Sequence, residues 1–417
     1  MGGCLDYPEA AVFLCTDVCP IFYGSGIECT GDKMKKIFGK FAAIIICIII
    51  IMSCASGISA QDKPIAEHTE SYVLMEPTTK TVIRERNGDV PVHMGSFNKL
   101  MTVLLAAEAV DRGELTFDTV LTTSENANSK QGAQIWLMPG EKSTLSELMK
   151  GVIIGNANDA ACVIAEKIGG SEDKFTELMN VRAAELGMKN TLFTECTGYY
   201  NDEMQHTTAY DAALLLCELS KHEEMTELFV TRLEEIKDGK VQLVTSNPMG
   251  HRYKGSVGFK CGTGPSSGYY AAEGACRDGF SLVCAVMDCK DEDRALGLAK
   301  ELLDLGFQGY TVRALEIPED MPGTVKVKNG RSTEAVISAG QTGNALIGKG
   351  TEEDIEARII LPSFVYAPVR RGDKVGELRY YCKGRLLKIT ELKAAEDIEK
   401  KSVMNVLSDM LKYLVEF

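Results

Sequence analysis

The chain has 417 residues, 45% of them hydrophobic and 25% charged, an ordinary composition for a globular protein with room for two or three domains. Its formal net charge is −14 and no basic stripe occurs, so we expect no nucleic-acid partner. The five histidines and the cysteines form no His-Glu-x-x-His and no paired Cys-x-x-Cys motif. The sequence therefore predicts neither a metal site nor another cofactor.

Residues 34–60 have the pattern of an export segment. A basic stretch, "KKIFGK", precedes the uncharged "FAAIIICIIIIMSCASGISA", as in a secretory signal peptide cleaved after Ala60. About 20 uncharged residues can also span a bilayer, so an N-terminal membrane anchor is an alternative. Lipid attachment at Cys54 is a third. Each alternative places residues 61–417 outside the cytoplasmic membrane, in the cell envelope or secreted.

Residues 1–33 do not fit this pattern, because the basic region of a signal peptide belongs near the start of a chain. We interpret Met34 as the initiator and the residues before it as a mis-called extension. An exported chain can form disulfides, although one of this size does not need them, so the pairing of its cysteines stays open. The cysteines that follow the export segment are Cys162, Cys196, Cys217, Cys261, Cys276, Cys284, Cys289 and Cys382.

From residue 71 onward, strand and helix patterns are mixed without the rhythm of a parallel βαβ fold. We expect two strands within residues 71–90, joined by a turn at Pro77–Lys80, and a further strand at residues 279–289. Helices are predicted from Gly95, over residues 143–170 with a break near Gly155, and over residues 171–188, 208–220 and 291–307. A capping box, "STLSE", starts the second of these helices. The mixture predicts an α+β fold for residues 61–309, with helices covering an antiparallel sheet.

The pattern changes near residue 310. Short strand-like segments separated by Gly, Pro and Asn predict a β-sandwich-like domain over residues 310–397, in which residues 367–392 form successive hairpins. Residues 398–417 have the pattern of an amphipathic helix with lysines beside its apolar face. Such a helix lies either in a membrane interface or against the β domain, and the sequence leaves both interpretations open.

One short stretch, "GSFNKLMT", places Ser96 three residues before Lys99 at the start of a predicted helix. Residues at i and i+3 share a helix face, so the lysine amine can reach the serine hydroxyl. A serine attacks once a base takes its proton, and a lysine is such a base when burial and neighbouring cations lower its pKa. The same spacing occurs in "SEDK" at residues 171–174, which we interpret as a helix cap. The pair alone is therefore a weak indication.

Two later segments, "NANDAAC" and "GFKCGTG", follow at the intervals of two partner motifs. With Ser-x-x-Lys they resemble the penicillin-recognising D-alanyl-D-alanine carboxypeptidases of low molecular mass. The segments "LMPGEKSTLSELMKG", "HTTAYDAALL" and "APVRRGDKVGEL" resemble the same family, and the resemblance extends from Ala66 to the end of the chain. It implies a catalytic domain of the fold shared by DD-peptidases and serine β-lactamases, followed by a β-rich domain.

The resemblance also implies roles by position. Ser96 would be the acylated nucleophile and Lys99 its general base. Asn158, in "NAND", would hold Lys99 and the substrate amide. Lys260 would bind the terminal carboxylate of the substrate, and Gly262 would let the substrate backbone approach the strand.

Two positions depart from the family pattern. Asn156 stands where the second motif begins with serine, and an amide relays a proton to the leaving group less well than a hydroxyl. Cys261 stands where the third motif has threonine or serine, and a thiol is a weak donor to a carboxylate. Both are substrate-binding positions, as is Thr263, whose backbone N–H would form the oxyanion hole with that of the nucleophile.

The resemblance implies a serine-type D-alanyl-D-alanine carboxypeptidase that removes the terminal D-alanine of peptidoglycan pentapeptide stems and that β-lactam antibiotics acylate. Three alternatives stay open on the sequence, and one of them is an envelope interaction protein in which all three motifs are coincidental. The departures in the second and third motifs allow a homologue that binds peptidoglycan or penicillin without turnover. A class A-like β-lactamase shares Ser-x-x-Lys, but we find no Glu-x-x-Leu-Asn loop, because Glu177 in "TELMN" falls in a periodic helix and is interpreted as solvated.

Overall fold

The computed structural model describes residues 70–199, 204–264, 267–404 and 407. The predicted export segment and extension lie outside these residues, as does most of the predicted C-terminal helix. Within the described residues, no helix is both long and apolar enough to cross a membrane.

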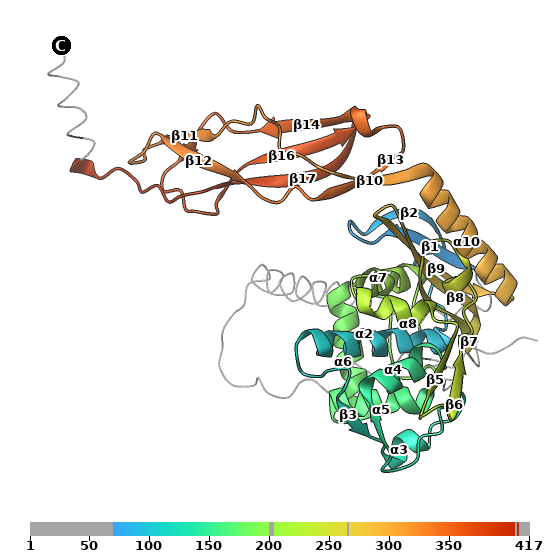
Figure 1. The fold of residues 1–417 in the computed structure, drawn as a ribbon. Coiled ribbons are helices and arrows are strands. Elements are labelled where there is room, and N and C mark those ends of the chain that lie inside the picture. The colour runs from blue at the N-terminus through green and yellow to red at the C-terminus, as the bar shows by residue number, and fades with distance from the viewer. Residues whose placement is uncertain (1–69, 200–203, 265–266, 405–406, 408–417) are drawn as a thin grey trace, which may run out of the picture. The chain divides into compact units, whose positions relative to one another are not determined.

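A five-stranded antiparallel sheet organises the N-terminal part of the described chain (Figure 1). Its strands, in spatial order, are β2 (Thr81–Arg86), β1 (Ser71–Glu76), β9 (Phe280–Cys289), β8 (Ser267–Arg277) and β7 (Ser256–Gly264). Side chains alternate between the faces of a strand. On β9, Val283 and Ala285 enter one core, whereas Leu282 and Cys284 enter another core together with α10 (Glu292–Gly309). The sheet is therefore buried on both faces, as the α+β prediction requires.

Helices fill the core on the other face of the sheet. The main ones are α2 (Lys99–Asp111), α4 (Leu145–Ile153), α5 (Asn158–Gly169), α6 (Glu172–Leu186) and α7 (Ala209–Leu219). Helix α2 is buried on almost every side, so it is the central helix of this core. The predicted capping box is confirmed, because Thr144 Oγ1 accepts from the Glu147 N–H while the Glu147 carboxylate accepts from the Thr144 N–H. The "SEDK" prediction is also confirmed, since Ser171 caps α6.

Shorter elements complete this part, and several of them were not predicted. Residues Gly95–Asn98 form a 3-10 turn, η1, and the α-helix begins only at Lys99. The other short elements are β3 (Val120–Thr122), α3 (Glu125–Asn128), β4 (Lys142–Thr144), η2 (Glu223–Met225), α8 (Thr226–Val230), β5 (Leu233–Ile236), β6 (Val241–Val244) and α9 (Met249–Arg252). The predicted break near Gly155 separates α4 from α5.

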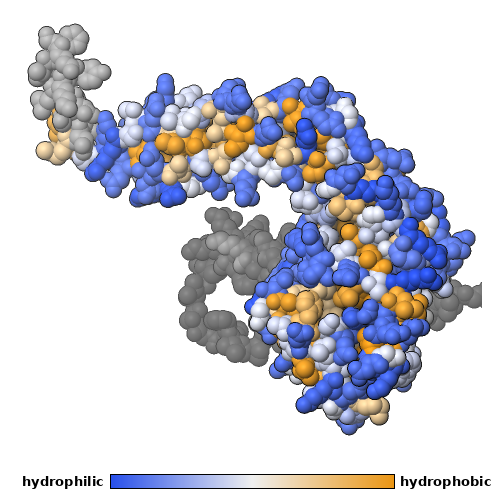
Figure 2. Space-filling model, viewed as in Figure 1, coloured by the Kyte–Doolittle hydropathy of each residue, from blue (hydrophilic) through white to orange (hydrophobic). Residues whose placement is uncertain are grey.

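The C-terminal part is rich in β structure, as predicted. Strands β10 (Tyr310–Ala314) and β13 (Asn344–Gly348) pair with each other. A six-stranded sheet contains, in spatial order, β14 (Ile355–Ile360), β16 (Lys374–Cys382), β17 (Arg385–Ala394), β12 (Glu334–Ala339), β11 (Thr324–Lys328) and β15 (Val365–Tyr366). A short 3-10 turn, η3, lies at Glu352–Asp354. This part has a core of its own, which includes Leu378, Tyr380 and Leu392. Figure 2 shows apolar side chains interspersed with hydrophilic ones on its surface.

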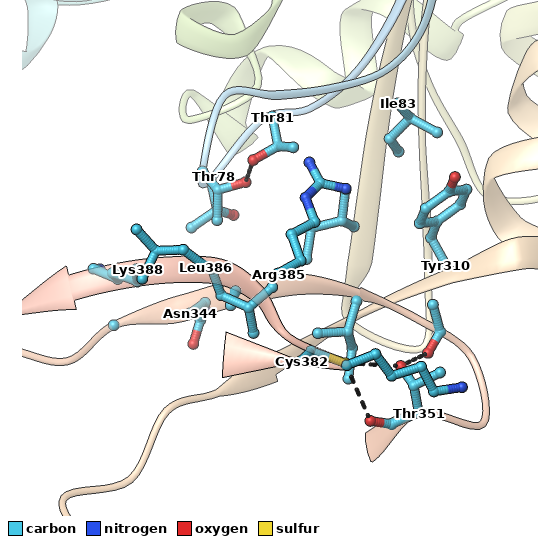
Figure 3. A pocket seen from close by; sticks show the side chains of 18 of the residues that line it. Thr78, Thr81, Ile83, Tyr310, Asn344, Thr351, Cys382, Arg385, Leu386 and Lys388 are labelled. Carbon is cyan, nitrogen blue, oxygen red and sulfur yellow. Dashed lines mark hydrogen bonds between the residues drawn. The ribbon is translucent and has the colours of Figure 1, made fainter. Parts of the chain in front are cut away.

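Two details of this part differ from the sequence-based expectation. Residues 367–392 contain one long hairpin, β16 and β17, instead of successive hairpins. Ile398 still pairs with Val369, so the chain is extended where the terminal helix was expected to begin. The Cys382 thiol is a donor to the Thr351 hydroxyl at 3.5 Å, which ties the end of β16 to the turn after β13 (Figure 3).

Candidate active site

Ser96 lies in the 3-10 turn before α2 and is 8% exposed. Its Oγ lies 2.8 Å from the phenolic oxygen of Tyr270 on β8. A Cβ added to Gly262 on β7 would lie 3.0 Å from the same Oγ. The serine hydroxyl therefore faces the strand that carries the third motif, and the missing side chain at position 262 keeps the space beside it open.

Lys99 follows Ser96 by one turn, and its side chain is buried. The Lys99 Nζ donates a hydrogen bond to the Thr197 carbonyl at 2.7 Å. Burial, and then the positive charge of Lys260, lower the pKa of Lys99 to about 7. Burial also lowers the pKa of Lys260 to about 8. Near neutral pH a large fraction of Lys99 is uncharged and has a lone pair to accept a proton, as a general base requires.

A loop at residues 195–198 accepts hydrogen bonds from Lys99 and from its neighbours at the start of α2. Three successive carbonyls of this loop accept hydrogen bonds from side chains around the start of α2: Glu195 O from Asn98 at 2.6 Å, Cys196 O from Thr102 at 2.9 Å and Thr197 O from Lys99. The Glu195 carboxylate in turn accepts from the Thr197 N–H and hydroxyl, both at 2.6 Å. The loop is thus anchored at each residue, which fixes the acceptor that orients the Lys99 amine.

A close backbone approach explains the glycine that ends this loop. Gly198 has φ +72°, and a Cβ there would lie 1.8 Å from the Gly95 carbonyl oxygen. No side chain fits in that space, so the loop can reach the turn that carries Ser96 only with glycine at this position.

Asn158, the first residue of α5, is also buried, and α5 packs against α2. Its Nδ2 donates to the Gln131 carbonyl, whereas its Oδ1 is buried and has no hydrogen-bond partner among the described residues. The Oδ1 of Asn156 is in the same situation. Two buried amide oxygens without partners are suited to accept hydrogen bonds from a bound substrate. The expected hydrogen bond from Lys99 to Asn158 is not formed, because the Lys99 amine donates to the Thr197 carbonyl instead. Contact of the two amides with substrate stays a prediction.

The two remaining substrate-binding predictions concern β7. The Cys261 thiol donates to the Ser246 carbonyl at 3.2 Å and packs in the core with Cys284 and α10. Burial raises the pKa of Cys261 to about 12, so the thiol stays protonated. The structure thus places this side chain in the protein interior and not beside Ser96. Thr263 is exposed, and its hydroxyl donates to the Gly268 carbonyl at 3.2 Å.

Tyr270 was missed by the sequence reasoning. It is 2% exposed, stands edge-on to Phe97 with ring centroids 5.8 Å apart, and touches the serine hydroxyl. Burial raises the pKa of Tyr270 well above its usual range, so the phenol is neutral and hydrogen-bonds without acting as a base. No motif marks this residue, because a tyrosine in an apolar strand is ordinarily a core side chain.

The sequence matches the models of two known protein families. The D-alanyl-D-alanine carboxypeptidase family matches residues 58–291, and the family described as the C-terminal domain of penicillin-binding protein 5 matches residues 316–400. The D-alanyl-D-alanine carboxypeptidase DacF of Bacillus subtilis is 31% identical over 382 residues, which are 90% of this chain and 97% of that protein. DacA of Escherichia coli is 26% identical, over 83% of this chain and 87% of its own length.

Solved structures share the fold. Penicillin-binding protein 5 of Haemophilus influenzae superposes with a TM-score of 0.72 at 23% identity, covering 81% of this chain and 99% of that one. A penicillin-binding protein of Listeria monocytogenes, solved in its cefotaxime-bound form, superposes with a TM-score of 0.52 at 24% identity, covering 58% of this chain and 98% of that one. A family match over more than half of the chain, together with a relative 31% identical over 90% of it, shows that the chain belongs to the D-alanyl-D-alanine carboxypeptidase family.

Proposed function

We propose that this carboxypeptidase removes the terminal D-alanine from the pentapeptide stem of peptidoglycan through an acyl-enzyme on Ser96. The observation that carries the proposal is a serine hydroxyl that faces Gly262 on the third-motif strand, one turn before a buried lysine whose pKa is lowered to about 7. A serine needs a base to become a nucleophile, and an uncharged amine in a buried site is such a base. The homologous carboxypeptidases support this reaction over the binding-only and β-lactamase alternatives. Glu177 is exposed on α6, which agrees with its interpretation as a solvated side chain.

The reaction would proceed in two steps. The Lys99 amine takes the Ser96 proton, and Oγ forms a bond to the carbonyl carbon of the penultimate D-alanine. The backbone N–H groups of Ser96 and Thr263 would stabilise the oxyanion. The C–N bond then breaks and D-alanine leaves with a proton, after which water attacks the ester and frees the serine. Lys260, still largely cationic at neutral pH, would bind the terminal carboxylate of the substrate.

The location of the substrate supports the proposed cellular setting. Peptidoglycan lies outside the cytoplasmic membrane, so the chain must be exported, and residues 34–60 are our candidate export segment. Whether residues 398–417 also contact a membrane surface stays a prediction. β-Lactams would acylate Ser96 as substrate mimics, which agrees with the cefotaxime-bound form of the Listeria monocytogenes relative.

The test is release of D-alanine from diacetyl-Lys-D-Ala-D-Ala by the purified chain. We expect release by the wild type and by Ser338→Ala, which changes an exposed serine of the C-terminal part, but not by Ser96→Ala. Fluorescent penicillin should label the same two active proteins. Labelling without D-alanine release would favour the binding-only homologue, and rapid hydrolysis of the drug would favour a β-lactamase.

A further inference from the structure

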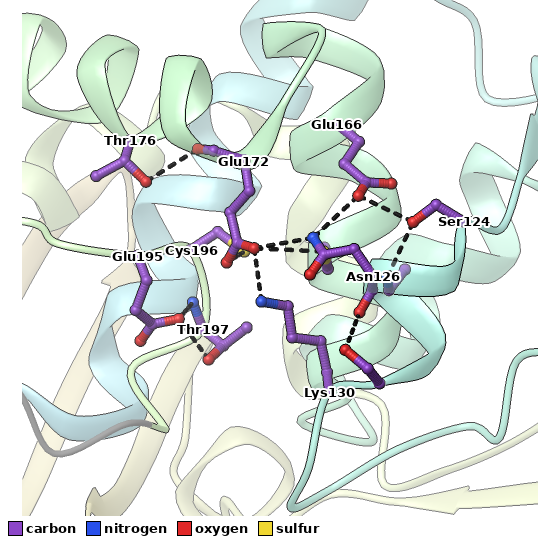
Figure 4. Close-up of polar contacts among 12 residues, drawn as sticks. Ser124, Asn126, Lys130, Glu166, Glu172, Thr176, Glu195, Cys196 and Thr197 are labelled. Carbon is purple, nitrogen blue, oxygen red and sulfur yellow. Dashed lines mark hydrogen bonds and ion pairs between the residues drawn. The ribbon is translucent and has the colours of Figure 1, made fainter.

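A polar cluster lies where α5, α6 and the 195–198 loop meet, and the proposed reaction does not use its side chains (Figure 4). Cys162 on α5 and Cys196 on the loop are both fully buried. The side chain of Glu172, the first residue of α6, is 16% exposed. One ligand atom from each of the three lies within 4.8 Å of the others. We propose that Cys162, Glu172 and Cys196 bind a thiophilic divalent cation of the zinc class.

The spacing of the three side chains fits a tetrahedral ion. The Cys196 Sγ lies 3.3 Å from one carboxylate oxygen of Glu172, and the Cys162 Sγ lies 3.9 Å from the other. Zinc binds sulfur at about 2.3 Å and oxygen at about 2.0–2.2 Å, which places tetrahedral sulfur and oxygen ligands roughly 3.5 Å apart. The Cys196 Sγ and Glu172 Oε1 already have this spacing, and the other ligand atoms, which lie within 4.8 Å of one another, must close by up to about 1 Å to coordinate one ion. Two sulfur ligands select zinc-like ions over the hard cations Mg²⁺ and Ca²⁺.

The three ligands and Lys130 balance the charge of such an ion, and the Glu166 carboxylate, which accepts from Asn126 Nδ2 at 3.0 Å, lies at the edge of the cluster. Two thiolates and the Glu172 carboxylate carry three negative charges, and a divalent ion with the Lys130 ammonium carries three positive ones. The Lys130 Nζ is 2.5 Å from Glu172 Oε2, which leaves Oε1, the atom beside Cys196, for the metal. Asn126 Nδ2 donates to Cys162 Sγ at 3.2 Å and to Glu172 Oε2 at 3.0 Å. Such outer hydrogen bonds orient ligands and stabilise a thiolate.

The ion would join segments that carry the candidate active site. Cys162 lies one helical turn beyond Asn158 on α5. The Cys196 carbonyl accepts from Thr102, and the next carbonyl accepts from Lys99. A metal on these thiols would cross-link α5 to the loop that orients Lys99, as a structural clamp beside the active site. Metal binding to the folded state also stabilises it by mass action.

The test is a titration of the reduced, chelator-treated full chain with Co²⁺ alone, whose bonds to thiolates give charge-transfer absorption in the near ultraviolet. We expect one Co²⁺ per chain, displaced by Zn²⁺, and an unfolding temperature raised by a few degrees at saturation. Cys162→Ser and Cys196→Ser should lose the absorption, and Glu172→Gln should weaken binding about tenfold. Cys382→Ser is the matched control and should bind as the wild type does.

Three results would overturn the proposal: no cobalt–thiolate absorption with the wild type, the same absorption with the Cys162→Ser/Cys196→Ser double variant, or a disulfide between the two cysteines in freshly purified protein. If a cysteine variant fails to fold, the wild-type protein still decides, since added Zn²⁺ must raise its unfolding temperature and a chelator must reverse the shift. These readouts require no substrate, so they stand or fall independently of the proposed reaction.

Discussion

The hydroxyl of Ser96 and the phenol of Tyr270 are 2.8 Å apart, and this contact joins the turn before α2 to strand β8. Because the phenol is neutral, it can donate to Ser96 Oγ and leave the serine proton directed at the base. Tyr270 is then a positioning residue that fixes the serine rotamer.

Removing the phenol should slow acylation without changing its pH dependence. For Tyr270→Phe we expect a rate constant for fluorescent-penicillin labelling about tenfold below that of the wild type, because the serine loses its orientation. The pH midpoint should not move, since the base is unchanged. Tyr269→Phe is the neighbouring control. If Tyr270→Phe were labelled at the same rate as the wild type, the contact would have no part in catalysis.

The lowered pKa of Lys99 predicts a pH profile. Below a pH of about 7 the amine is protonated and cannot accept the serine proton, so acylation should fall about tenfold per pH unit. Between about pH 7 and 8 the rate should level off, and at higher pH it should fall, because Lys260 then loses the charge that would bind the substrate carboxylate. Lys260→Gln removes the like charge that helps lower this pKa, so the midpoint should move to higher pH. Labelling rates measured across the pH range check both points, and a midpoint unmoved by Lys260→Gln would contradict the assigned coupling.

A methyl group at position 262 should block the site. In Gly262→Ala the new carbon would lie 3.0 Å from Ser96 Oγ and 3.3 Å from the Tyr270 hydroxyl. We expect D-alanine release to fall at least about tenfold, because the serine or the substrate must move. Gly297→Ala, on α10 where a Cβ meets nothing within 4 Å, is the control and should stabilise the fold by about 0.5–1 kcal/mol. Full activity of Gly262→Ala would argue against substrate approach over this strand.

Backbone conformation accounts for the asparagine in the second motif. Asn156 has φ +56°, a left-handed conformation that asparagine and glycine adopt more readily than other residues. Asn156→Ser and Asn156→Ala should each lower the free energy of unfolding by about 1 kcal/mol, and Asn156→Gly should change it much less. Chemical denaturation measures the three values. Equal losses for alanine and glycine would show that the side-chain amide, and not the backbone, decides stability here.

Local patterns predicted much of this fold. The strands within residues 71–90, the cap at Ser171 and the helix at residues 291–307 all follow from turn, capping and periodicity rules that act over a few residues. The Ser96–Lys99 pair was visible for the same reason, since both residues lie within one turn of chain. The family resemblance then supplied the distant partner motifs.

Contacts between distant segments could not be predicted in this way. Tyr270 meets Ser96 across 174 residues, and only the sheet topology brings them together. The cysteine–glutamate cluster was missed because its members are separated by 10 and 24 residues, unlike the short spacings of common zinc motifs. The interior position of Cys261 depends on which face of β7 turns toward the core that α10 also fills, which no local pattern records.

The central claim is that Ser96 Oγ forms the covalent bond to the acyl group. Peptide mapping by mass spectrometry after brief incubation with benzylpenicillin tests it most directly. The account predicts one penicilloyl group per chain, on the peptide that contains Ser96, and no adduct in Ser96→Ala. An adduct on Cys261 or any other residue, or unchanged labelling of Ser96→Ala, would contradict it.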